Sequence, residues 1–147
     1  MKRRVFIQAA VAASVSMPLL AMAAAPVIEV YKTESCGCCG AWVEHLKANG
    51  FVTRVVNVDD PGHYRERGGI PHELGSCHTG MVQGYAIEGH VPASDIKRLL
   101  AARPKARGLA VPGMPLGSPG MEGPRKDPFD VLLVDAKGRS SVFKHYN

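Results

Sequence analysis

The feature that most constrains this chain is a cluster of three cysteines in residues 35–40, which read S-C-G-C-C-G. A segment rich in β-branched residues, Pro26 to Tyr31, precedes the cluster, and apolar residues at helical spacing follow it. Cys36 and Cys39 therefore form a C-x-x-C pair between the first strand and the first helix of a βαβ unit. The same turn holds another thiol, Cys38, which a single disulfide does not need.

The rest of the chain continues this pattern of strands and helices. We predict a strand at Phe51 to Val58 and a short helix at Asp60 to Arg67. A β-hairpin formed by Thr79 to Val82 and Tyr85 to Glu88 follows, and then a helix at Pro92 to Ala102. The order is β-α-β-α-β-β-α, as in the thioredoxin fold. We therefore predict an α/β, thioredoxin-like core with helices on both faces of a central sheet.

The composition changes after this core. Residues 104–128 are rich in Pro and Gly and have no periodicity, which predicts a long loop. Val131 to Val134 and Ser141 to Tyr146 then predict a C-terminal β-hairpin. We expect three segments: a signal peptide at 1–23, a thioredoxin-like domain at 24–104, and a loop and hairpin extension at 105–147.

The first 23 residues have the pattern of a secretory signal peptide. A basic K-R-R start precedes an apolar run from Val5 to about Ala21, and Ala21-Met22-Ala23 is a small-x-small cleavage site. R-R-V-F-I also resembles a twin-arginine signal, and an uncleaved membrane anchor is the alternative, although Pro18 interrupts the run. We expect cleavage after Ala23 and a mature periplasmic protein without a stable membrane span.

The formal charge of +5 overstates how basic the mature chain is. Three of the 18 Lys and Arg residues, Lys2, Arg3 and Arg4, lie in the signal, which leaves 15 basic against 13 acidic residues. This small excess, without a basic run interleaved with aromatic residues, argues against nucleic-acid binding.

Several thiols at one helix start favour a soft metal. Free N–H groups and the helix dipole stabilise thiolates there, but a dipole effect of about 1 kcal/mol does not offset the repulsion among them. Cations must do so, and thiolate and thioether ligands select Cu(I). Neighbouring helical residues point about 100° apart, so Cys38 and Cys39 do not aim at one ion. A polynuclear copper–thiolate cluster therefore explains the turn better than a mononuclear zinc site.

Further ligands are expected from distant segments. In a thioredoxin-like fold the loop that enters the third strand packs against the C-x-x-C pair, and here it holds Cys77 and His78. Met114 and Met121 lie among glycines and prolines that expose side chains, so we predict that their thioethers close over the site. Two histidines remain open candidates, His45 and His90.

Three other interpretations stay open. An oxidising compartment allows a framework of two disulfides, although frameworks normally spread their cysteines along the chain. A thiol–disulfide oxidoreductase would use Cys36 as nucleophile and Cys39 as resolving thiol, but it leaves Cys38, Cys77 and the methionines without a role. A passive Cu(I) chaperone without redox turnover fits the residues as well as a redox protein does.

Five motifs occur in order along the chain: C-G-C-C-G, G-S-C-H-T, I-E-G-H-V-P, L-A-V-P-G-M-P and G-S-P-G-M-E. This set resembles the CopG-type family of exported proteins associated with bacterial copper resistance, over essentially the whole mature chain. The resemblance implies a thioredoxin-like domain with a metal-binding C-terminal extension. It also implies that the protein interconverts Cu(I) and Cu(II) ahead of efflux.

The resemblance further implies a set of site residues. The cluster thiols are Cys36, Cys38, Cys39 and Cys77, and their neighbours are His78, Met114 and Met121. The partners it implies are copper ions together with a periplasmic efflux system or an electron donor or acceptor. Whether the chain turns over as an enzyme stays open; as a copper oxidoreductase it would use Cys36 and Cys39 as its reacting thiols.

Overall fold

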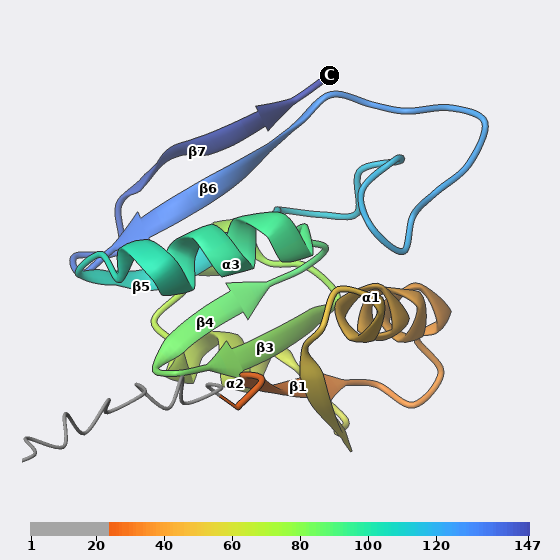
Figure 1. The fold of residues 1–147 in the computed structure, drawn as a ribbon, viewed down its shortest axis with the longest axis horizontal. Helices are drawn as coiled ribbons and strands as arrows, with labels where there is room; N and C mark the ends of the chain where they lie inside the picture. Colours follow the sequence, from red (N-terminus) through yellow and green to blue (C-terminus); the bar gives the residue numbers. More distant parts are fainter. Residues whose placement is uncertain (1–23) are drawn as a thin grey trace, which may run out of the picture.

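The computed structural model describes residues 24–147, which form one seven-stranded sheet with helices packed on it (Figure 1). The strand order is β2-β1-β3-β4-β5-β6-β7. β1 (Val27–Lys32) pairs in parallel with β2 (Val52–Asn57) and antiparallel with β3 (His78–Val82). β3 pairs antiparallel with β4 (Tyr85–Glu88). The predicted α/β class and the β-α-β-α-β-β-α order are confirmed, whereas the predicted signal peptide lies outside the described residues.

The helices cover both faces of the sheet, and the side-chain alternation of β4 shows which helix covers which. The helices are α1 (Gly37–Ala48), α2 (Gly62–Arg67), the 3-10 helix η1 (His72–Leu74) and α3 (Ala93–Ala102). Tyr85 and Ile87 point into a core shared with α1 and α3, while Ala86 joins Ile70 and Leu74 on the opposite face. The site described below lies at the N-terminus of α1.

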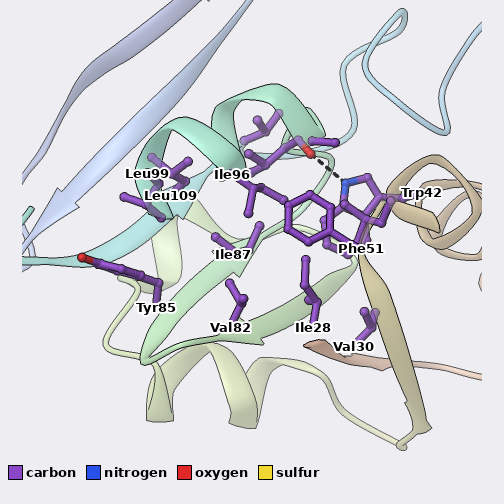
Figure 2. Close-up of a cluster of buried hydrophobic side chains, with 14 of the residues drawn as sticks. Ile28, Val30, Trp42, Phe51, Val82, Tyr85, Ile87, Ile96, Leu99 and Leu109 are labelled. Atoms are coloured by element: carbon purple, nitrogen blue, oxygen red, sulfur yellow. Dashed lines mark hydrogen bonds between the residues drawn. The ribbon is translucent and has the colours of Figure 1, made fainter. Parts of the chain in front are cut away.

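Most of the hydrophobic core lies between the sheet, α1 and α3 (Figure 2). Trp42 of α1 is fully buried in it, and its indole N–H donates to the Val91 carbonyl at 2.8 Å. Ile28 of β1 and Ile96 of α3 are also fully buried there. Burial of each such side chain stabilises the fold by about 1.5–3 kcal/mol. This packing fixes α1, and with it the cysteine turn, against the sheet.

The predicted loop at 104–128 contains a strand that the sequence analysis missed. β5 (Ala106–Ala110) pairs in parallel with β4 and antiparallel with β6 (Phe129–Asp135). Its core-forming part, residues 108–110, is a short apolar run without alternation, as expected of a strand buried on both faces. Gly108 permits close pairing, because a Cβ there would lie 1.7 Å from the Ala86 carbonyl oxygen. The true loop is residues 111–128.

The predicted C-terminal hairpin is present. β6 pairs antiparallel with β7 (Ser140–Tyr146) and lies beside β5, so the hairpin belongs to the same sheet as the core. The loop 111–128 leaves the sheet after β5 and returns at β6, and Figure 1 shows it passing on the α1 side of the molecule. Within residues 24–147, none of the helices has both the length and the apolar composition needed to span a bilayer.

Candidate metal centre

The cysteine turn occupies the start of α1, as predicted. Cys36 is the N-cap residue, and Cys38 and Cys39 lie in the first turn. That turn contains no acidic residue, and no side chain caps it. The first N–H groups of a helix have no partner within the helix, so they and the dipole favour negative charge at these sulfurs.

Cys36 and Cys39 are joined as a disulfide, and Cys39 is fully buried. Cys38 and Cys77 are free thiols and partly exposed. The Cys38 sulfur lies 3.6 Å from that of Cys36 and 3.9 Å from that of Cys77. This pairing differs from the four free thiols expected of a copper–thiolate cluster, and also from a framework of two disulfides.

The loop entering β3 brings Cys77 to the turn, so that all four cysteine sulfurs lie within 4.8 Å of one another. A metal–sulfur bond of about 2.3 Å in a tetrahedral site places its sulfurs about 3.8 Å apart, which is close to the spacing around Cys38. Burial and the neighbouring Cys38 raise the pKa of Cys77 to about 12. A metal bound at Cys77 must therefore displace its proton.

Two histidines complete the inner side of the site. The Cys77 sulfur lies 3.4 Å from Nδ1 of His78 and 3.2 Å from Nε2 of His90. Nδ1 of His90 donates to the Pro119 carbonyl at 2.8 Å, so its Nε2 lone pair faces Cys77. Nε2 of His78 is buried without a hydrogen-bond partner. The ring of His78 packs against Trp42 with 4.3 Å between centroids.

Both rings are held neutral by burial, which is the form that binds metal. Burial lowers the pKa of His78 to about 3, and the nearby His90 adds to this effect. Burial also lowers the pKa of His90. The sequence analysis left His90 open, since its only signal was its place in G-H-V-P just before the last core helix.

His45, the other open candidate, serves a different purpose. Its Nε2 atom accepts a hydrogen bond from the backbone N–H of Ala93 at 3.0 Å. Ala93 is the first residue of α3, so His45 satisfies one of the free amides at the start of that helix. The structure therefore joins His45 to α3 rather than to the cysteines.

The two predicted methionines differ in their placement. Sδ of Met114 lies 4.0 Å from the Cys38 sulfur, and the residue is 51% exposed. The backbone of Met121 exchanges hydrogen bonds with Gly117 and Ser118 to close a turn, each at 2.8 Å. The structure thus brings the Met114 thioether to the cysteines and uses Met121 to shape the loop.

The loop 111–128 lies directly on the start of α1. Gly120 has φ +89°, and a Cβ there would lie 2.7 Å from the Cys38 carbonyl oxygen and 2.9 Å from the Trp42 nitrogen. Only glycine fits this close approach. On the other side of the site, the Ser76 hydroxyl donates to the Gly113 carbonyl. The loop is therefore attached on both sides of the cysteines.

A buried carboxylate that sequence reasoning missed lies behind Cys77. Glu88 is fully buried and accepts hydrogen bonds from the Ser76 N–H at 2.7 Å and the Thr79 hydroxyl at 2.6 Å. Arg65 lies 3.5 Å from the same carboxylate. Burial raises the pKa of Glu88, while hydrogen bonds from Thr79 and Ser76 oppose the rise. No sequence pattern distinguished this residue from an exposed strand glutamate.

The donor set suits a soft metal. Thiol, thioether and imidazole groups converge on one partly exposed region, and no carboxylate belongs to either cluster of candidate ligands in the described part of the chain. Sulfur-rich sites select Cu(I), and imidazole also binds copper. These residues therefore fit copper. All four sulfurs can bind it only when the Cys36–Cys39 disulfide is reduced.

Comparisons with known proteins agree with this chemistry. Residues 74–121 match the family model described as a protein of unknown function, DUF411. A solved structure described as copper resistance protein CopG, form 2, is 44% identical, with a TM-score of 0.80; the match covers 84% of this chain and 99% of that one. Form 1 is 45% identical, with a TM-score of 0.77, and the match covers 82% and 96%. No curated protein matches the chain.

Proposed function

The chain belongs to the CopG family of copper-resistance proteins, and from this premise we propose that it is an exported periplasmic protein that binds copper and interconverts Cu(I) and Cu(II). The observation that carries the proposal is the convergence of four cysteine sulfurs within 4.8 Å of one another. Once the Cys36–Cys39 bond is reduced, four thiolates this crowded need soft cations to coexist. Copper is the cargo and the redox substrate of this site.

We assign the ligands according to the oxidation state of the cysteines. With Cys36 and Cys39 bonded, Cys38 and Cys77 still offer sulfur, together with the His90 imidazole and the Met114 thioether. Reduction adds the sulfurs of Cys36 and Cys39 and allows a bridged, polynuclear cluster. His78 and Met121 remain proposed neighbours, His78 through its contact with Cys77.

The Cys36–Cys39 pair also gives the redox step an electron source. Oxidation of two thiols to one disulfide releases two electrons and two protons, which balances the reduction of two Cu(II) ions to two Cu(I) ions. Cys36 is the partly exposed sulfur and Cys39 the buried one, so Cys36 meets the incoming reactant. A periplasmic electron donor would restore the dithiol, and an efflux system would accept the copper.

An anaerobic copper titration of the reduced protein tests the proposal. We expect more than one Cu(I) ion per reduced chain and fewer per chain with the disulfide intact. A clean one-to-one complex with the reduced protein would exclude the cluster. Copper-edge absorption of protein taken from the periplasm checks occupancy and location together, and cyclic voltammetry separates a redox protein from a passive chaperone.

The Cys36–Cys39 disulfide also favours a second function, that of a thiol–disulfide oxidoreductase. This function needs an exposed nucleophile and a resolving thiol, but not Cys38 or the Met114 thioether. Insulin reduction by the metal-free protein distinguishes the two functions. Robust turnover that persists in Cys38→Ser would favour the oxidoreductase.

A further inference from the structure

We propose that Glu88 is a positioning residue, which holds the three ligand-bearing segments of the site in one arrangement. The proposal rests on the proposed copper function. Glu88 ends β4 and lies two residues before His90. Its side chain reaches the Cys77 segment, and its backbone reaches the start of the loop that carries Met114.

The side chain of Glu88 spans the Cys77–His78 pair. One carboxylate oxygen accepts from the Ser76 N–H at 2.7 Å, and the other accepts from the Thr79 hydroxyl at 2.6 Å. Ser76 and Thr79 are the residues on either side of that pair. One buried group therefore fixes the backbone before Cys77 and the side chain after His78.

Glu88 is also linked to the start of the loop 111–128, which carries Met114. The Glu88 carbonyl accepts from the Val111 N–H at 3.0 Å, where the loop 111–128 begins. Ser76, held by the Glu88 carboxylate, donates through its hydroxyl to Gly113, and Gly113 donates to the Gly75 carbonyl at 3.0 Å. Met114 follows immediately, so its sulfur position depends on this connection.

The backbone after Glu88 packs tightly on the same point. Gly89 has φ +71°, and a Cβ there would lie 2.5 Å from the Val111 carbonyl oxygen and 2.7 Å from the Ser76 side chain. Its N–H donates to the His78 carbonyl at 3.0 Å. The segments carrying Cys77, His90 and Met114 thus cross at Glu88 and Gly89.

The chemistry of the buried Glu88 carboxylate indicates that it positions the site rather than stabilises the fold. A buried ion pair such as Glu88 with Arg65 contributes little net stability, and apolar residues of similar volume often replace such pairs without loss. An apolar side chain at this position, however, leaves the Ser76 N–H without its acceptor. Residues that orient metal ligands through hydrogen bonds typically change metal affinity by about 10–100-fold when replaced.

Two variants and a matched control test the proposal. Glu88→Gln keeps the shape but weakens the hydrogen bonds, since a charged acceptor binds roughly twice as strongly as a neutral one. The double variant Arg65→Met/Glu88→Leu removes the pair without leaving a buried, unpaired charge. Glu73→Gln makes the same chemical change as Glu88→Gln at an exposed residue of η1.

We expect Cu(I) affinity, measured by competition with a chromogenic chelator, to fall about tenfold or more in the double variant, with an altered thiolate-to-copper absorption spectrum. Without metal, amide hydrogen exchange should accelerate at Ser76 and Gly113 but not in α3. Glu88→Gln should show the same changes to a smaller extent, and Glu73→Gln should match the unmodified protein.

Unchanged affinity, spectrum and local exchange in the double variant would overturn the proposal while leaving the copper function intact. Uniformly faster exchange throughout the fold would also overturn it, because Glu88 would then serve only stability. If the unmodified protein binds no copper, the proposed function fails, and local exchange at Ser76 and Gly113 still decides whether Glu88 holds these segments.

Discussion

Nε2 of His90 lies 3.2 Å from the sulfur of Cys77, although Cys77 precedes β3 and His90 follows β4. The opposite ring nitrogen is bound to the Pro119 carbonyl, which fixes the tautomer that presents a lone pair to the sulfur. A hydrogen bond from the outer nitrogen to a carbonyl is a usual feature of histidines that bind metal.

Replacing His90 should weaken copper binding. In His90→Gln the imidazole donor beside Cys77 is lost, and we expect Cu(I) affinity to fall about tenfold or more, the scale found for changes around metal ligands. Chelator competition measures the change. The control is His63→Gln, because His63 is exposed on α2. Equal Cu(I) affinities in the two variants would show that His90 does not contribute to copper binding.

The Met114 thioether should contribute to affinity but not to folding. Met114→Leu keeps the size of this half-exposed side chain and removes its sulfur, which lies 4.0 Å from Cys38. We expect about tenfold weaker Cu(I) binding, or about 1.4 kcal/mol, at an unchanged melting temperature. Met81→Leu in β3 is the matched control. An effect of Met121→Leu as large as that of Met114→Leu would show that both thioethers cap the site.

A side chain at Gly120 should displace the loop from α1. Gly120→Ala places a Cβ against backbone atoms of Cys38 and Trp42 at a positive φ, a conformation that costs about 1–3 kcal/mol for other residues. Denaturant unfolding should show the loss, and the Pro119 bond to His90 should weaken with it. Gly123→Ala is the control, since a Cβ there meets nothing within 4 Å. Identical stability of both variants contradicts this account of the loop.

Cys77 should react slowly in the folded, metal-free protein. Burial raises its pKa from 9.0 to about 12, so at pH 8 its reactive thiolate is on the order of a thousandfold scarcer. Its alkylation by iodoacetamide, followed by mass spectrometry, should accelerate as pH rises toward 12 and should be fast in urea. Folded and unfolded protein reacting at the same rate at pH 8 would show that the thiol is not perturbed.

Local sequence patterns predicted the elements around the site well. The C-x-x-C pair, the stripe of Trp42 and Leu46, and the Gln83-Gly84 turn each depend on short-range rules, and the structure has a helix and a hairpin there. β5 was missed because a buried parallel strand has no alternation, and here it follows a proline at residue 104. Its position in the sheet depends on pairing with distant strands.

The candidate site was predictable only in part. The cysteines and Met114 had a signal, because soft ligands are unusual in an exposed loop or a crowded turn. His90 was left open on its position alone and Glu88 had no signal, since their roles depend on the crossing of the Cys77 segment with the β4–α3 connection. The pairing of Cys36 with Cys39, and not with Cys38, likewise depends on the geometry of the helix start.

The packing of Trp42 against His78 has an optical consequence. This indole is the single tryptophan of the chain and is sealed from solvent. Its ring packs at a tilt against the His78 imidazole, which touches Cys77. Figure 2 shows Trp42 at the α1 end of the core. If copper binds at that sulfur as proposed, we expect it to quench the emission of Trp42, so that tryptophan fluorescence would report occupancy of the site without a label.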